Sequence, residues 1–159
     1  MEKIKIRFAG KGDLNALAEM AAAFDAHFMA LDGRAGAVLG TAARKLEIRN
    51  LNFTKNPLMR TLVAELGGRI IGAISFYKGF TVDHGAAYHL PYFFIRPEFR
   101  GGRAAPLFFD AIKKLARREK IQSLVFSVYG PNKNAARLYA HAGAKYWAAD
   151  DEHFMYMNL

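Results

Sequence analysis

The segment that most constrains the fold runs from residue 86 to residue 119. Its first part, AAYHLPYFFI (86–95), is rich in aromatic and branched residues, as strands are, and its last part (103–119) repeats apolar residues at helical spacing. Between them lies RGGR (100–103), two adjacent glycines with an arginine on either side. Small residues before a helix let an anion approach its free N–H groups. The junction is therefore either a phosphate-binding turn or only a tight connection.

Alternation and helical spacing predict the other elements. Gly67-Gly68 is a two-residue hairpin signal, and Pro91 predicts a bulge in its strand because proline cannot donate to a sheet ladder. Gly143 is typical of the residue that follows a helix. In order, we expect strand 3–8, a helix capped by Asp13, helix 41–51, strands 59–66, 69–77 and 86–95, helix 103–119, strand 123–128, helix 132–142, and strands 145–148 and 153–158 joined by the turn Asp150-Asp151-Glu152. This order predicts an α/β fold in a single domain, 1–159.

Composition excludes several classes of site. The chain has 159 residues, 52% of them hydrophobic, which favours a packed core over disorder. It has no cysteine, so disulfides, thiolate metal sites and a cysteine nucleophile are excluded. The five histidines show no ligand spacing, so we expect no metal. No apolar run reaches the ~20 residues of a membrane span, and the N-terminus lacks a signal-peptide core. We therefore expect a cytoplasmic protein without a membrane partner.

The net charge of +9 favours an anionic ligand, nucleic acid or an anionic surface without choosing among them, and it also fits a basic protein whose charge has no single purpose. Most aromatic residues fall inside predicted strands or buried helix faces rather than among exposed Lys and Arg. A nucleic-acid-binding protein is therefore the least favoured function, and we expect no nucleic-acid partner.

Two motifs resemble those of one superfamily. RGGRAA (100–105) resembles the R-x-x-G-x-G/A turn of the GNAT superfamily of acyl-CoA-dependent N-acetyltransferases, and NKNAARLYAHAG (132–143) resembles its second signature, N-x-x-A-x-x-L-Y-x-x-x-G. One helix and one strand separate the motifs, as in that family. Arg103 departs from the turn's central glycine, so its φ must stay negative to avoid strain. HLPYFFIRPEFRG more weakly resembles the polyamine and diamine acetyltransferase branch, but Pro91-Tyr92 replaces that branch's Glu-Asp pair, which argues against a polyamine specialist.

The resemblance implies a mixed, mostly antiparallel sheet of six to seven strands flanked by about four helices, with two central strands splayed apart. It implies an enzyme that transfers an acetyl group from its co-substrate acetyl-CoA to a primary amine of a small molecule or protein, as a possible homodimer. The pantetheine arm would lie along strand 88–95, and the pyrophosphate on the N–H groups of 101–105. The residues implied to bind acetyl-CoA are Phe94, Ile95, Arg100, Gly101, Gly102, Arg103, Ala104, Ala105, Asn132, Lys133 and Ala135.

The catalytic candidates are Tyr139 and His89. Tyr139, at the motif's tyrosine position, is either the general acid for the leaving thiolate or a core aromatic of an amphipathic helix. His89 is either a general base or a structural histidine, and Tyr92, Asp83, Glu98 or a water path are weaker candidates for the base. Asn132 is a helix N-cap, a ligand contact or both. Lys133 and Arg137 either reach the 3′-phosphate of CoA or are solvated helix charges.

The altered turn and the lack of an obvious carboxylate base leave a second function open. The chain is then a non-catalytic acyl-CoA-binding module. We expect the first helices and residues 32–58 to line any acceptor pocket, although the sequence does not specify the acceptor.

Overall fold

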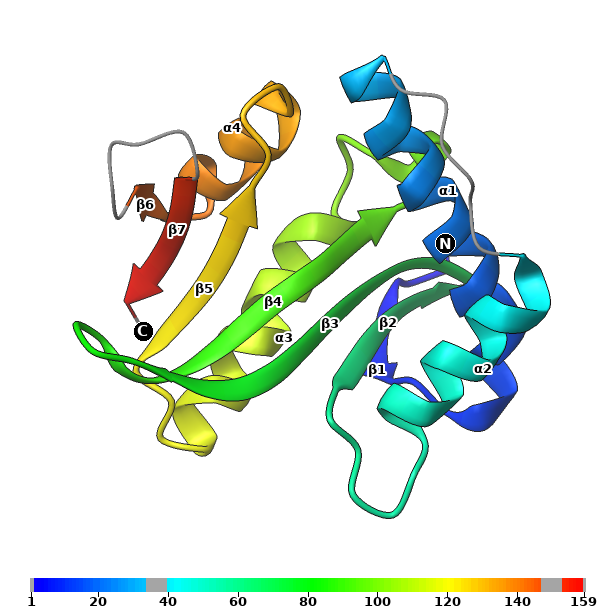
Figure 1. Cartoon of the computed structure of the whole chain (residues 1–159), viewed down its shortest axis with the longest axis horizontal. Coiled ribbons are helices and arrows are strands. Elements are labelled where there is room, and N and C mark those ends of the chain that lie inside the picture. The colour runs from blue at the N-terminus through cyan, green and yellow to red at the C-terminus, as the bar shows by residue number, and fades with distance from the viewer. Residues whose placement is uncertain (1, 34–39, 147–152, 159) are drawn as a thin grey trace. The chain divides into compact units, whose positions relative to one another are not determined.

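The computed structural model describes residues 2–33, 40–146 and 153–158. Seven strands and four α-helices lie within these residues (Figure 1). The strands are β1 (Lys5–Phe8), β2 (Arg60–Leu66), β3 (Arg69–Thr81), β4 (Gly85–Ile95), β5 (Ser123–Val128), β6 (Lys145–Tyr146) and β7 (His153–Asn158). The helices are α1 (Leu14–Asp32), α2 (Thr41–Asn52), α3 (Ala104–Arg118) and α4 (Lys133–His141), with short 3-10 turns at η1 (Lys11–Asp13) and η2 (Pro97–Phe99).

The chain's contacts divide it into two compact units. Unit 1 comprises Met1–Ser75 and Tyr92–Ala105, and unit 2 comprises Phe76–Pro91 and Pro106–Leu159. The strand order is β1-β2-β3-β4-β5-β7-β6. The β1–β2, β5–β7 and β6–β7 pairs are antiparallel, whereas β4 and β5 are parallel. The predicted α/β fold with a mixed, mostly antiparallel sheet is confirmed, whereas the single domain stays a prediction.

The parallel pairing of β4 with β5 is short. It joins Ala87 to Ser123, Tyr88 to Leu124 and His89 to Val125 and ends there, although β4 runs on to Ile95 and β5 to Val128. Backbone groups beyond the last pair are therefore not used in this ladder. The predicted parting of two central strands is confirmed by this register.

Strand β4 also changes its hydrogen-bonding sides along its length. Near its start, the carbonyl of Ala86 accepts a bond of 2.9 Å from Gln122, which directly precedes β5. After its end, the N–H of Arg96 donates a bond of 2.9 Å to Ile71 in β3. Residues an even number apart in a regular strand face the same neighbour, so an extra residue must lie between these two. This irregularity includes the position of Pro91, as predicted.

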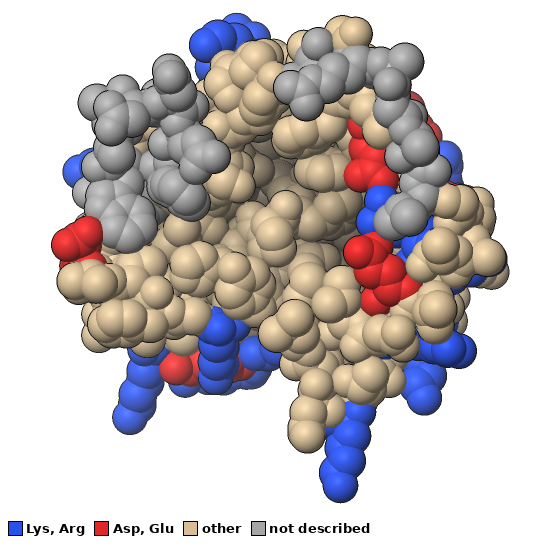
Figure 2. Space-filling model, viewed as in Figure 1, with Lys and Arg blue, Asp and Glu red and all other residues tan. Residues whose placement is uncertain are grey.

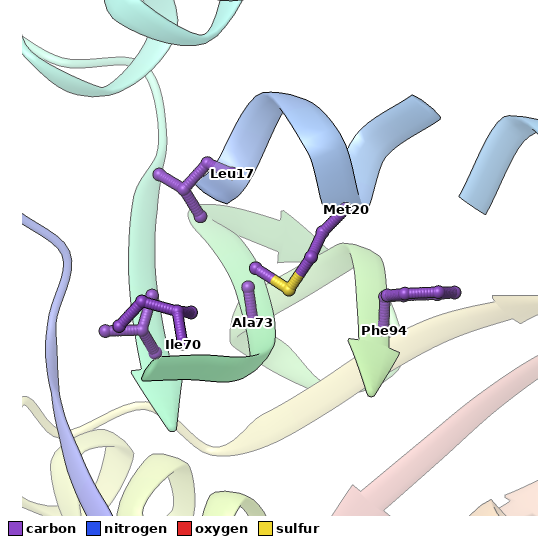
Figure 3. Packing of buried hydrophobic residues seen from close by; sticks show 6 residues of the cluster. Leu17, Met20, Ile70, Ala73 and Phe94 are labelled. Atoms are coloured by element: carbon purple, nitrogen blue, oxygen red, sulfur yellow. The ribbon is translucent and has the colours of Figure 1, made fainter. Parts of the chain in front are cut away.

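Unit 1 has its own hydrophobic core. Leu17 and Met20 of α1 point toward Ile70 and Ala73 of β3 and toward Phe94 of β4 (Figure 3). Met20 and Ala73 are fully buried. Burying this apolar stripe holds α1 against the strands of the unit.

Unit 2 is organised around α3 and β5. Phe108 and Ile112 are fully buried, and the ring of Phe109 meets that of Phe126 edge-on at 6.2 Å. Lys113 Nζ donates to the carbonyl of Ala142 at 3.1 Å, which links α3 to the C-terminus of α4. One cation of the predicted basic cluster thus satisfies a helix-end carbonyl.

Most local signals are confirmed, with adjustments. Gly67 and Gly68 have φ of 57° and 75°, as a two-residue hairpin of type I′ requires. Gly143 has φ of 93° after α4. Strand β3 continues to Thr81, four residues beyond the prediction of 69–77. Residues 147–152, with the predicted acidic turn, lie outside the described residues.

The predicted cap at Asp13 is wrong in detail. Its side chain makes no capping bond to α1; instead its carboxylate accepts from Gly10 N at 2.8 Å and from Arg7 Nη1 and Nη2 at 2.7 and 2.9 Å. These contacts tie β1 to the turn before α1. The hydrogen bonds from Arg7 hold the pKa of the Asp13 carboxyl below its usual value.

Replacing Asp13 with asparagine should lower the free energy of unfolding at pH 7 by about 1–2 kcal/mol, because charge-assisted bonds to Arg7 are lost. The folded pKa is depressed, so this contribution is complete above the unfolded pKa of about 3.9 and disappears as pH falls through the lower folded value. Urea unfolding at pH 7 and at acid pH measures both. The exposed Asp110→Asn should change little, and a deficit that persists at low pH contradicts the assignment.

Candidate functional site

The turn between β4 and α3 leaves backbone donors open. Gly101 has φ of 75°, a left-handed conformation that favours glycine, and 101–103 are exposed. The first N–H groups of a helix have no partner inside it, and no described residue accepts a hydrogen bond from the N–H groups of 101–105. A Cβ built at Gly101 would meet nothing within 4 Å, so no other side chain covers this residue. The turn fits a bound anion.

Arg103 does not strain this turn. Among the residues that the structure describes, Lys120 is the one non-glycine residue with positive φ, so Arg103 keeps the negative φ that its side chain requires. It immediately precedes Ala104, the first residue of α3, at the N-cap position. The departure from the motif glycine therefore leaves the backbone donors in place.

Arg100 folds back onto its own unit. Its Nε donates to the carbonyl of Ile95 at 2.9 Å, and its guanidinium carbon lies 5.2 Å from the centre of the Phe94 ring. The side chain therefore braces the end of β4 against the turn. The structure brings these three predicted residues together, while their contact with acetyl-CoA stays a prediction.

The backbone of β4 distinguishes Ile95 from Phe94. Because the N–H of Arg96 faces β3, alternation turns the N–H of Phe94 toward β3 and that of Ile95 toward the opposite edge. Of the two residues predicted to polarise the thioester, Ile95 has the better placed donor.

Asn132 is the N-cap of α4. Its Oδ1 accepts from the N–H of Ala135 at 3.1 Å, which satisfies one donor of the first turn. Lys133 is exposed, and Arg137 donates to Asn134 at 2.7 Å on the helix surface. The cap role that was one of two possibilities for Asn132 is confirmed.

Tyr139 is buried in unit 2. Its ring stacks on Phe126 with centroids 4.6 Å apart and 22° between planes, and it meets Phe109 edge-on at 6.2 Å. Burial raises the pKa of Tyr139 to about 12, so its hydroxyl is protonated at neutral pH. A neutral, rigidly held phenol fits both a proton donor and a core aromatic.

His89 lies against β3. Its ring stacks on Tyr77 with centroids 5.1 Å apart and 11° between planes. A Cβ at Gly79 would come within 2.5 Å of this ring, so a glycine in β3 makes room for it. Burial lowers the pKa of His89, which favours the neutral imidazole. These contacts support a structural role, and catalysis by His89 stays a prediction.

Unit 1 contains a cavity of about 160 Å³ beneath α1 and α2. Its lining includes Ala21, Arg44, Asn52, Thr61, Ser75 and Tyr92. The first helices were expected to line an acceptor pocket, and α1 and α2 do line this cavity. The sequence did not point to Thr61 and Ser75, because they lie on different strands and no spacing relates them.

Two other kinds of site are not observed among the described residues. No cluster of three or more His, Asp or Glu side chains there is arranged to hold a metal ion. Nor is any helix in those ranges both long and apolar enough to span a membrane.

Comparison with known proteins agrees with this fold. The acetyltransferase (GNAT) family model matches residues 39–144, and the chain belongs to that family. The sequence matches none of the curated proteins.

Several solved structures share the fold. A possible acetyltransferase from Clostridium difficile 630 has a TM-score of 0.75 at 17% identity, covering 92% of this chain and 93% of that chain. PaiA N-acetyltransferase from Thermoplasma acidophilum, in complex with coenzyme A, has a TM-score of 0.73 at 16% identity, covering 99% of both chains. Spermidine N-acetyltransferase from Vibrio cholerae, in complex with CoA and spermine, has a TM-score of 0.71 at 18% identity, covering 98% and 95%. At these identities the likeness shows the fold alone.

Proposed function

We propose that the chain transfers an acetyl group from acetyl-CoA to a primary amine of a small molecule or protein. The observation that carries the proposal is the start of α3, where uncovered N–H groups follow Gly101 and Gly102. An anion at this position gains both hydrogen bonds and the positive end of the helix dipole. Family membership and the CoA complexes of two structural neighbours support a CoA diphosphate as that anion.

The remaining CoA contacts follow from the same residues. The N–H of Ile95 is directed away from β3 and would donate to the thioester carbonyl, where negative charge develops during attack. Arg103 would add a charge-assisted contact beside the diphosphate. Exposed Lys133 would meet the 3′-phosphate.

The chemistry needs two proton transfers. An alkylammonium with a pKa of ~10.4 must first lose a proton, to water or to a side chain such as His89. The neutral amine then attacks the carbonyl carbon, an N–C bond forms, and the C–S bond breaks. Tyr139 would donate its proton to the leaving sulfur, which becomes the free thiol of CoA.

Calorimetric titration with acetyl-CoA at physiological salt should show saturable binding at one site per chain. Release of free thiol across a panel of primary amines should then identify turnover. Absence of acetyl-CoA binding contradicts the proposal. Binding without thiol release for any amine favours the non-catalytic module instead.

A further inference from the structure

We infer that the cavity of unit 1 takes the non-reacting part of the acceptor, and that this part is a compact, mostly apolar group carrying one neutral hydrogen-bond acceptor such as an amide carbonyl. The inference rests on the proposed function in one respect, that the occupant is the acceptor. It goes beyond it by naming the chemical class of the acceptor.

One wall of the cavity already satisfies its own polar groups. Thr61 Oγ1 donates to Asn52 Oδ1 at 2.7 Å and lies 2.8 Å from Ser75 Oγ. Since the proton of Thr61 is used, Ser75 is the donor in the second bond. Asn52 Nδ2 donates in turn to the carbonyl of Ile48 at 3.0 Å. This wall requires no ligand.

The opposite groups are unsatisfied. Tyr92 Oη and Arg44 Nε are buried and have no hydrogen-bond partner among the described residues. A buried donor without a partner costs free energy, and native proteins rarely leave one. Both atoms belong to residues that line the same cavity, so one acceptor atom placed there can satisfy them.

The state of each donor indicates what it binds. Burial, and the nearby carboxylate of Asp25, raise the pKa of Tyr92, so its hydroxyl keeps its proton. The ring packs on Phe24 at 4.8 Å, which fixes its position. Arg44 Nε can only donate. An ammonium group would leave this donor unpaired and would lie beside a guanidinium.

The charge balance disfavours an anion as well. Arg44 pairs through Nη2 with Asp25 and through Nη1 with Glu47 at 2.5 Å. Figure 2 shows such acidic and basic side chains together over α1 and α2. One guanidinium already faces two carboxylates, so a third would be repelled in a poorly solvated site. A neutral acceptor oxygen is the remaining choice.

The size of the cavity limits the group. A volume of about 160 Å³ is close to the ~150 Å³ that accommodates a six-carbon ring in an apolar protein cavity. Leu17 and Leu51 supply apolar lining. The occupant therefore has about six non-hydrogen atoms, mostly carbon.

The binding test uses butyramide, butyrate and butylammonium without acetyl-CoA, followed by ligand-observed NMR titration. Butyramide should bind with a dissociation constant on the order of millimolar and at least about tenfold more tightly than either charged probe. Tyr92→Phe keeps the ring and should weaken butyramide about tenfold. Ala21→Leu should abolish its binding by filling the cavity. Tyr146→Phe, on the exposed strand β6, should change nothing.

The outcomes are separable. Absence of saturable butyramide binding, equal binding by Tyr92→Phe, or preference for butylammonium or butyrate overturns the inference. A second assay compares 4-aminobutyramide, 1,4-diaminobutane and 4-aminobutyrate by thiol release. The amide should have about tenfold higher kcat/KM, through KM, and Tyr92→Phe should remove that preference. Equal turnover of all three overturns the inference and leaves the proposed function standing. Bound acetyl-CoA without any turnover contradicts the proposed function, while the NMR result still decides what the cavity binds.

Discussion

Replacing Tyr139 with phenylalanine should lower kcat by about a hundredfold or more, the usual contribution of a general acid. The stacked ring on Phe126 and the edge contact with Phe109 are retained, so the packing of unit 2 is preserved. The affinity for acetyl-CoA should stay within about twofold, because the hydroxyl is required only when the thiolate leaves. Steady-state thiol release and calorimetric titration measure the two quantities.

The matched control is Tyr146→Phe, which removes a hydroxyl from a largely exposed residue of β6. It should leave kcat unchanged. Thermal unfolding of Tyr139→Phe should show a stability change of no more than about 1 kcal/mol. If kcat of a folded Tyr139→Phe equals that of the wild type, Tyr139 is a core aromatic and another group protonates the thiolate.

The second large effect is expected at the N-cap of α3. Arg103→Asp should weaken acetyl-CoA binding about a hundredfold, because a carboxylate competes with the diphosphate for the same N–H groups and repels it. The same change should raise the free energy of unfolding by about 0.5–1 kcal/mol, since aspartate is a favourable N-cap near the positive end of a helix dipole. Binding and stability are thus expected to change in opposite directions.

Arg103→Asn separates charge from capping. Asparagine has nearly the same shape and also caps, so the gain in stability should persist, while affinity should fall only several-fold through loss of the arginine. Calorimetry measures affinity and urea unfolding measures stability. Equal acetyl-CoA affinities for the aspartate and asparagine variants would show that the diphosphate binds elsewhere.

Local sequence signals determined the elements of this protein. Gly67-Gly68 specifies the β2–β3 hairpin because two consecutive positive φ angles suit glycine, and Asn132 begins α4 because its short side chain reaches the N–H of Ala135. The same is true of the turn before α3, where Gly101 takes the positive φ and Arg103 avoids it. Such features need only a few neighbouring residues, so the sequence is enough to predict them.

Tertiary structure decided which side chains meet. The sequence predicted a helix cap for Asp13, but Arg7 competes for its carboxylate. It left His89 open as a base, and the space above Gly79 places its ring on Tyr77. The cavity with Tyr92 and Arg44 could not be foreseen, because it forms only when two helices and three strands come together. Periodicity shows which face of an element is buried, whereas contacts between distant residues depend on how those faces pack.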